Sequence, residues 1–342
     1  MASNKGFIRY TKITIFFTIF VVFAGSMVKV TGSGMGCPDW PKCFGYYIPP
    51  FNAEKLEWKP NFDYHAGEMI FWEGDLLKAD RDFKTNEVHN GSNWSIYDKH
   101  DYKIYKPMHT IIEYVNRLVS VLLGISVLLM IIFAFKSDRK RGVNVVVSLL
   151  ALFLIGFNAW LGKLVVDNVL APSSISYHMF AAFALVVTLS FAYTKNREKS
   201  SFTYPKLYKR IQIVAFIFLI YQLFFGVILR QTFDYLVGVS RGDWVNSAGL
   251  NFLVHRSSSL VYVALGFVTY RMLRYVPKDS FEWKNFKWVI ICTIGEVISG
   301  AIMGYLDVPK AAQPFHVIVS SILLLVQSNL FFKIINKSTK YG

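Results

Sequence analysis

The stretch PMHTIIEYVNRLVSVLLGISVLLMIIFAF, residues 107–135, decides the fold class of this chain. From Leu118 to Phe135 it contains no charged side chain, and its apolar residues form a long run instead of an amphipathic stripe. An α-helix needs about 20 such residues to cross ~30 Å of hydrocarbon. The stretch therefore predicts a helix that spans a membrane.

Runs of the same kind recur along the whole sequence. The 342 residues are 54% hydrophobic and only 17% charged, whereas about a quarter of an average soluble domain is charged. We therefore predict an all-α integral membrane protein with eight transmembrane helices. The predicted spans are residues 12–31, 107–135, 143–165, 171–193, 208–229, 247–273, 285–305 and 309–334.

The net charge of +15 fits a membrane protein better than a nucleic-acid-binding protein. Most basic residues stand in loops that share one side of the membrane with the N-terminus, as the positive-inside rule expects. No basic face with interleaved aromatic residues stands outside the spans, so we expect no nucleic-acid partner. We predict cytoplasmic termini and external loops at 32–106 and 230–246. The basic residues that set this orientation are Lys136, Arg139, Lys140, Arg141, Lys195, Arg197, Lys199, Lys206, Lys209, Arg210, Arg271, Arg274, Lys278, Lys284, Lys287, Lys333, Lys337 and Lys340.

The external loop 32–106 is the only sizeable segment outside the predicted spans. It is polar and aromatic, and Asn90-Gly91 is a turn signal. We predict a folded or half-folded loop that caps the membrane domain and is too small to be an independent domain.

Three sequence matches between the halves indicate an internal duplication. Three matches in the same order predict two parallel four-helix bundle repeats, related by an axis along the membrane normal. We place them at residues 1–195 and 196–342. The matching positions are Gly25, Val28, Lys29 and Thr31 with Gly226, Leu229, Arg230 and Thr232; Asn116, Arg117 and Ser120 with His255, Arg256 and Ser259; and Gly162 and His178 with Gly300 and His316.

Seven histidines divide into two groups. Four lie within or at the mouth of a predicted span, where an ionisable side chain is costly and usually functional. These four are His109, His178, His255 and His316, whereas His65, His89 and His100 lie in the external loop and are expected to be solvated. The topology brings the first group to the outer half of the membrane, two in each half of the chain.

Paired imidazoles on separate helices suit a flat haem with an axial histidine on each face, whereas zinc prefers four tetrahedral ligands. His255 and His316 would form such a pair. Arg256 and Arg230 could neutralise haem propionates, or could simply reach the membrane interface.

The second span carries a polar face of its own. His109, Glu113 and Asn116 are spaced by four and three residues, so they share one side of a helix, with Arg117 beside them. A carboxylate at this depth must be paired, protonated or catalytic. Glu113 could pair with His109 or Arg117, or could manage charge and protons at a reacting substrate.

A cysteine pair follows the first span in the motif Cys37-Pro38-Asp39-Trp40-Pro41-Lys42-Cys43. On an oxidising face the two cysteines can close a disulfide. This bond would be either a structural staple or a redox-active or substrate-guarding bond.

Together these motifs resemble the haem A synthases that carry a cysteine pair. The first external loop, residues 31–43, is similar to theirs, as are Ile112-Glu113-Tyr114 with Arg117, and the histidines His178, His255 and His316. The resemblance covers essentially all eight spans and leaves out only about residues 50–106.

The resemblance implies an oxidoreductase of the cell's inner membrane. Such enzymes oxidise the C8 methyl group of haem O to a formyl group through hydroxylated intermediates. By this resemblance the C-terminal half holds a permanent haem b through His255 and His316, and the N-terminal half receives haem O. Glu113 is then the essential carboxylate, and Cys37 and Cys43 form a disulfide near the substrate. A haem O synthase is the expected neighbour, besides membrane lipid.

One position departs from the family pattern. Many members have histidine where this chain has Asn116, and asparagine is a poor ligand for haem iron. His109 could bind the substrate iron together with His178, from about 10 Å along the helix axis. Alternatively, the substrate iron has a single protein ligand.

Two other functions fit part of this pattern. A b-type cytochrome that transfers electrons without oxidising a substrate would explain the histidines, but it leaves Glu113 and the cysteine pair without a task. A transporter would explain the parallel repeats, but its polar residues would be expected near the midplane.

Overall fold

A computed structural model describes residues 2–99, 104–197, 204–236 and 238–335. Among these residues, eight helices are long and apolar enough to cross a membrane, which confirms the predicted number and class of spans. They are α1 (Ala2–Thr31), α2 (Pro107–Phe135), α3 (Arg141–Asp167), α4 (Pro172–Lys195), α5 (Lys206–Tyr235), α7 (Leu250–Leu273), α8 (Phe281–Tyr305) and α9 (Ala312–Ile335). The predicted residues His100, Lys199, Lys337 and Lys340 lie outside the described part of the chain.

Several helices differ from prediction at their ends. α1 begins at Ala2 and α5 extends to Tyr235, because polar residues can continue a helix beyond its apolar run. The predicted sixth span is divided. The short helix α6 (Trp244–Ala248) is separated from α7 by Gly249, which adopts a positive φ of 51°. Glycine has no Cβ, so it tolerates this conformation at a helix junction.

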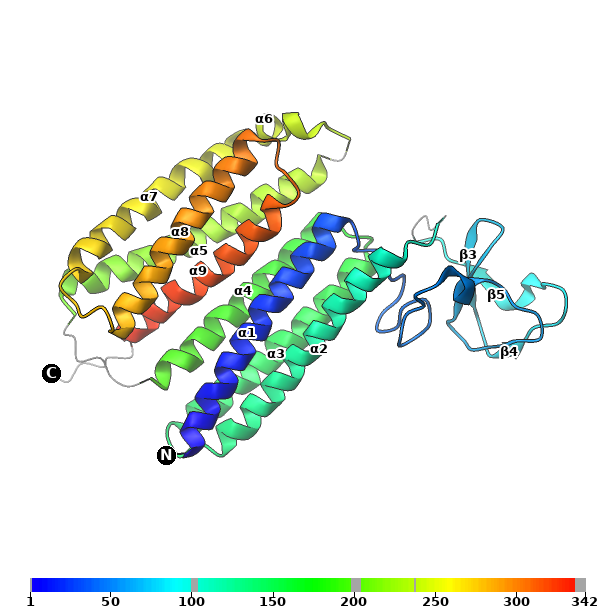
Figure 1. Cartoon of the computed structure of the whole chain (residues 1–342), viewed down its shortest axis with the longest axis horizontal. Helices are drawn as coiled ribbons and strands as arrows, with labels where there is room; N and C mark the ends of the chain where they lie inside the picture. The colour runs from blue at the N-terminus through cyan, green and yellow to red at the C-terminus, as the bar shows by residue number, and fades with distance from the viewer. Residues whose placement is uncertain (1, 100–103, 198–203, 237, 336–342) are drawn as a thin grey trace.

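The helices form two bundles that lie side by side (Figure 1). One bundle contains α1 to α4, and the other contains α5 and α7 to α9. One apolar cluster includes Leu123, Met130 and Leu189 of the first bundle, and another includes Leu219, Phe286 and Leu324 of the second. The second cluster also contains Val186 of α4, so it extends into the first bundle. The division into two parallel repeats stays a prediction.

Polar side chains inside the bundles are paired with each other. Gln212 on α5 donates to Thr269 at 2.9 Å, and Gln327 on α9 donates to Gln212 at 3.1 Å. Ser190 on α4 donates to Asn329 on α9 at 2.8 Å, which links the two bundles. Polar groups buried among apolar helices need such partners, because no water is present to replace them.

The external segment folds into small strands that the sequence patterns did not predict. β2 (Met69–Trp72), β3 (Asp75–Ala79) and β5 (Trp94–Ile96) form an antiparallel sheet, and β1 (Asp63–Tyr64) pairs with β4 (Phe83–Lys84). The turns η1 (Ala53–Leu56) and η2 (Gly91–Asn93) complete the segment. In Figure 1 the strands lie beyond the first turn of α2 and to the side of the first bundle, not over both bundles.

Candidate functional site

Four polar residues of the internal repeat each face a glycine of a neighbouring helix. A Cβ on Gly226 of α5 would stand 3.1 Å from Cε1 of His255 on α7. At the matching place in the first bundle, a Cβ on Gly25 of α1 would stand 3.8 Å from Oδ1 of Asn116 on α2. The sequence match between these helices therefore corresponds to a match in packing.

The second pair of matched glycines, Gly162 and Gly300, also faces polar side chains of neighbouring helices. A Cβ on Gly162 of α3 would stand 3.6 Å from Cε1 of His178 on α4, and a Cβ on Gly300 of α8 would stand 3.8 Å from Cε1 of His316 on α9. All four polar residues lie within the first three turns of α2, α4, α7 and α9. They therefore gather at the end of the bundles that carries the external segment.

In the second bundle two histidines face each other across the helices. The ring centres of His255 and His316 are 6.4 Å apart. Two imidazoles bound on opposite sides of one metal ion, each with a bond of ~2 Å, have ring centres about 6 Å apart. Nδ1 of His255 is buried and has no hydrogen-bond partner among the described residues. Both observations fit an iron with two axial histidines.

The described residues offer no other metal site: no group of three or more His, Cys, Asp or Glu side chains converges among them. Structural zinc takes four protein ligands, so the described residues give no support to the zinc alternative.

The first bundle has one histidine and one asparagine at the equivalent places. The buried Oδ1 of Asn116 has no hydrogen-bond partner among the described residues. With its amide oriented to satisfy both ends, Asn158 of α3 donates to Nδ1 of His178 at 3.3 Å. His109 is half-buried in the first turn of α2, seven residues before Asn116. The structure thus brings His178 and Asn116 into the repeat-related positions and leaves His109 nearer the helix end.

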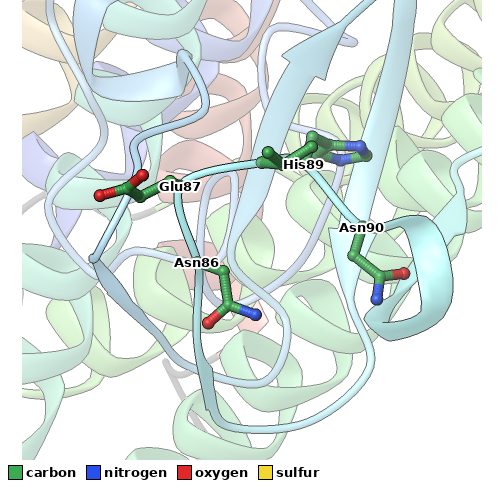
Figure 2. Close-up of a pocket in the computed structure, with 5 residues that line it drawn as sticks. Asn86, Glu87, His89 and Asn90 are labelled. Carbon is green, nitrogen blue, oxygen red and sulfur yellow. The ribbon is translucent and has the colours of Figure 1, made fainter.

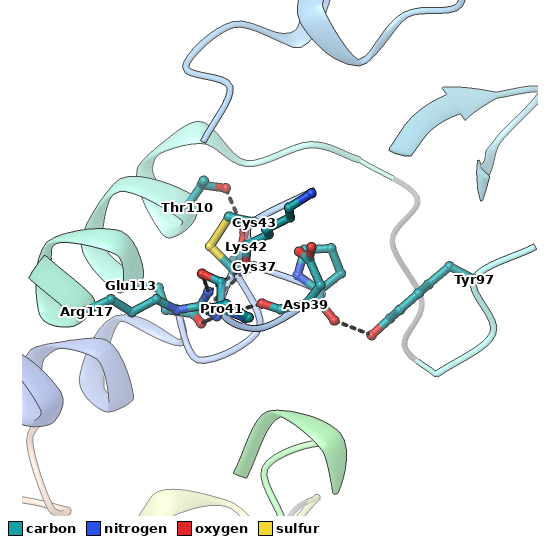
Figure 3. A network of polar contacts seen from close by, with 11 residues as sticks. Cys37, Asp39, Pro41, Lys42, Cys43, Tyr97, Thr110, Glu113 and Arg117 are labelled. Carbon is teal, nitrogen blue, oxygen red and sulfur yellow. Dashed lines mark hydrogen bonds and ion pairs between the residues drawn. A yellow bond between two sulfur atoms is a disulfide. The ribbon is translucent and has the colours of Figure 1, made fainter. Parts of the chain in front are cut away.

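Glu113 and Arg117 hold the loop of the cysteine pair (Figure 3). Glu113 lies on α2 with 6% of its side chain exposed, and its Oε1 is 2.7 Å from Nη2 of Arg117. Its Oε2 accepts a hydrogen bond from the backbone N–H of Cys37 at 3.0 Å. Arg117 in turn donates to the backbone oxygens of Lys42 at 2.7 Å and Asp39 at 3.0 Å. Of the two partners that the sequence allowed for Glu113, His109 and Arg117, the structure has the pair with Arg117.

The loop itself is closed by the disulfide Cys37–Cys43, as predicted. Gly36 packs so closely on α2 that a Cβ there would stand 2.4 Å from the carbonyl oxygen of His109. Thr110 donates to the carbonyl oxygen of Gly36 at 2.8 Å. Substitution of Gly36 would therefore push the disulfide loop away from Glu113.

Asp39 stabilises the turn of this loop from within. Its Oδ2 accepts from the backbone N–H of Gly45 at 2.9 Å, while its Oδ1 is buried with no partner among the described residues. Burial raises the pKa of the Asp39 carboxyl above its ordinary value, against the smaller opposing effects of the Gly45 hydrogen bond and the Arg117 charge.

The two arginines expected near haem propionates differ in their surroundings. Arg230 on α5 pairs with Asp234 at 2.5 Å and donates to Ser176 on α4 at 2.6 Å. Lys29, the repeat counterpart of Arg230, lies 2.8 Å from the same Asp234. Arg256 is exposed and stacks over Phe252 with its guanidinium carbon 5.5 Å from the ring centre. Arg230 therefore lies between the two bundles, whereas Arg256 lies on the surface of the second.

Sequence reasoning missed one acidic residue at the site. Oε2 of Glu296 on α8 lies 3.1 Å from Nε2 of His316 and accepts from Ser320 at 3.0 Å. The signal was present, because Glu296 is an acidic residue inside an apolar span and precedes Gly300 by four residues, as Asn158 precedes Gly162.

The histidines of the external segment are separate from this site. His65 is exposed, as predicted, and lies 3.5 Å from Asp82. His89 is half-buried instead of fully solvated, because its ring stacks on Trp72 with centres 4.3 Å apart. It lies on a surface depression (Figure 2), whose lining residues are Asn86, Glu87, Val88, His89 and Asn90.

A sequence model of the family described as Cytochrome oxidase assembly protein (COX15-CtaA) matches residues 8–71 and 97–328. The chain belongs to this family. The match includes the disulfide loop, Glu113 and all four matched glycines. The unmatched residues 72–96 contain β3, β4, η2 and β5, so the segment outside the family pattern is shorter than the predicted 50–106.

Two curated relatives carry the name that the sequence motifs suggested. A protein named Heme A synthase from Shewanella oneidensis is 22% identical over 247 residues, which are 70% of this chain and 62% of the relative. A protein of the same name from Shouchella clausii is 23% identical over 274 residues, which are 75% of this chain and 73% of the relative. The chain thus spans less than two thirds of the first relative. The expected resemblance to haem A synthases is confirmed by both names.

Proposed function

We propose that this chain is a haem A synthase, which oxidises the C8 methyl group of haem O to a formyl group through hydroxylated intermediates. The substrate is haem O, and the cofactor is a permanently bound haem b. The proposal is supported by the family, by the names of the relatives and by the facing histidines of the second bundle.

The C-terminal half, residues 196–342, would hold haem b. His255 and His316 are the residues that would hold it, because their ring centres are 6.4 Å apart across the bundle. Arg256 and Arg230 are the proposed partners of the propionates. When bound, haem b supplies one-electron transfer.

The N-terminal half, residues 1–195, would receive haem O. His178 is the proposed iron ligand there, with Asn116 at the place that His255 occupies in the other half. His109 is the proposed second ligand if one is used. Arg117 would act indirectly, by fixing the loop that covers the first turns of α2.

The observation that carries the proposal is an asymmetry between the two halves. The repeat that matches Asn116 with His255 also matches Glu113 with Phe252, so the carboxylate on this helix is present in the first half alone. The carboxylate of the second half, Glu296, is on α8 and contacts His316, whereas Glu113 contacts the disulfide loop. A b-type cytochrome with two equivalent haem sites does not account for this difference. We propose that Glu113 manages charge and protons while the methyl group is oxidised.

The disulfide loop would position this carboxylate. The backbone N–H of Cys37 and the guanidinium of Arg117 fix the two oxygens of Glu113 from different sides. A carboxyl group held in this way keeps one orientation, as a catalytic group requires. The loop would also shield the reacting carbon from bulk water.

We also propose an orientation in the cell's inner membrane. The basic loops predict cytoplasmic termini, so the disulfide loop and the four helix ends that carry the site would face the external side. A haem O synthase is the proposed neighbour, because it would release the hydrophobic substrate into the same membrane.

The test is a haem analysis of protein purified from cells that also make haem O. The non-covalent haems of the wild type and of Glu113→Gln would be extracted and separated by chromatography. We expect haem b in both, and haem A or its hydroxylated precursor only in the wild type. Haem b alone in both samples would contradict the synthase and favour the electron-transfer cytochrome.

A further inference from the structure

His178 and His316 are the two proposed haem ligands that each face a glycine of the preceding helix. Their polar surroundings differ. His316 in the second bundle is in contact with two polar residues of α8. Its Nδ1 is 2.8 Å from Oγ of Ser299, and its Nε2 is 3.1 Å from Oε2 of Glu296. Ser320, one turn along α9, donates to the same oxygen of Glu296 at 3.0 Å.

The internal repeat identifies the equivalent residues in the first bundle. His178 and His316 are 138 positions apart, as are Gly162 and Gly300. The same offset matches Glu296 with Asn158, Ser299 with Leu161 and Ser320 with Ala182. Three polar positions around His316 thus correspond to one amide and two apolar residues around His178.

The hydrogen bonds assign different tautomers to the two rings. Ser299 donates its only hydroxyl hydrogen to the carbonyl oxygen of Gly295 at 2.7 Å. Its oxygen is therefore free to accept from Nδ1–H of His316. Nε2, which faces Glu296, is then the nitrogen left to bind iron, and the Glu296 contact would give way to the metal. In the first bundle Asn158 donates to Nδ1 of His178, which favours a hydrogen on Nε2. A metal-binding histidine usually donates its other ring N–H to an acceptor, and this contact fixes both tautomer and ring orientation.

We infer that Ser299 is a positioning residue that makes His316 a permanent haem ligand, because it accepts from Nδ1–H and leaves Nε2 for the iron. The lack of such an acceptor at the equivalent position beside His178, which is Leu161, makes the first site exchangeable. This difference suits a protein that keeps one haem and turns over another, and the inference therefore rests on the proposed function. Ser299 is not a catalytic residue, because it acts on the haem through His316.

The test measures how fast each haem leaves the purified protein. Protein loaded with haem b and haem O would be mixed with an excess of apomyoglobin, and the haem transferred would be identified by chromatography. We expect Ser299→Ala to release haem b about 10–100-fold faster than the wild type, the usual effect of losing such a partner. Ser299→Thr keeps the hydroxyl and should retain the slow release.

Two further variants separate positioning from a general loss of structure. Leu161→Ala alters the equivalent position of the first bundle and should leave the release of haem b unchanged. Leu161→Ser adds an acceptor beside His178 and should slow the release of haem O, which a damaged fold would not do.

The outcomes distinguish this inference from the proposed function. Equal release of haem b from the wild type and Ser299→Ala would overturn the inference while leaving the synthase proposal in place. A wild-type protein that binds no haem b would overturn the proposed function and the inference together.

Discussion

Both oxygens of the Glu113 carboxyl are held by the chain, one by Arg117 and the other by the backbone N–H of Cys37. A buried carboxyl normally needs such partners, because an unpaired one loses several kcal/mol of hydration. The same contacts fix the disulfide loop on α2. Glu113 therefore has two roles: it is the proposed catalytic carboxylate, and it holds the disulfide loop on α2.

Asp39 makes the stability of this loop depend on pH. Burial raises its pKa in the folded protein, so the folded loop favours the protonated carboxyl. The contribution of Asp39 to loop stability is therefore greatest at low pH and decreases as the pH rises from about 4, the ordinary value, through the raised value. We expect Asp39→Asn to remove this decrease.

Hydrogen exchange of the peptide that contains Cys37 would measure the effect, after correction for the intrinsic exchange rate at each pH. Protection should fall as the pH rises above about 4 in the wild type and stay nearly level in Asp39→Asn. Asp63→Asn, at an exposed position of β1, is the control and should follow the wild type. Identical pH profiles for the wild type and Asp39→Asn would refute this role.

At the scale of single residues, the sequence predicted which residues belong to the site better than it predicted what they contact. Glu113 and the four span histidines were identified because ionisable residues stand out in apolar runs. Glu296 could have been found by the same rule, but Ser299 could not, because a serine in a membrane helix usually bonds only its own backbone. The hydrogen bond from Cys37 to Glu113 depends on how a loop folds back, which no local pattern specifies.

At the scale of helices, glycines set the space around the site residues. Gly226 lies on α5 where a Cβ would come 3.1 Å from the ring of His255, so the ring would have to move by a few tenths of an ångström. Gly266 on α7 has open space where a Cβ would stand. The two positions therefore form a matched pair for substitution.

We expect Gly226→Ala to bind several-fold less haem b than the wild type, and Gly266→Ala to bind a normal amount. Alanine favours a helix by ~1 kcal/mol over glycine at both positions, so helix propensity does not explain a difference. The absorbance of reduced haem per milligram of protein would measure the occupancy. Equal occupancy in both variants would mean that Gly226 does not position His255.

The helices were predictable and the external strands were not. Long apolar runs identify a membrane span almost regardless of context, and all eight were located. The strands are two to five residues long and lie among polar residues, so their alternation is too short to detect. They form because Leu56, Met69 and Leu76 pack in one cluster and Ile70 and Trp94 in another.

At the scale of the whole molecule, one acidic residue joins the two bundles. Asp234 lies between Arg230 of the second bundle and Lys29 of the first, at 2.5 Å and 2.8 Å. These two cations occupy equivalent positions of the proposed repeat. Two like charges therefore meet at the interface between the bundles. Asp234 neutralises one of them.

Asp234→Asn should destabilise the protein, because it leaves two cations facing each other. Since 20% of the Asp234 side chain and 31% of that of Lys29 are exposed, solvent reduces the effect to about 1–2 kcal/mol from the larger value of a fully buried pair. The thermal midpoint in detergent should decrease. In the double variant Lys29→Met/Asp234→Asn it should recover in part, and a midpoint lower than that of Asp234→Asn would argue against the charge explanation.

The proposed duplication rests on three matched sequence motifs that keep the same order. The sequence did not show why these positions match. The structure shows that each matched glycine faces a matched polar residue. The departures from symmetry carry the proposed function: Glu113 against Phe252, Asn116 against His255, and Asn158 against Glu296.

The central claim is that this chain converts haem O to haem A. The most direct measurement is made in cells that produce haem O but have no haem A synthase of their own. Their total haems would be extracted and separated with and without expression of the wild-type chain. The account predicts haem A, with a smaller amount of the hydroxylated intermediate, only when the chain is present. Well-expressed protein containing haem b, in cells that accumulate haem O and no haem A, would contradict it.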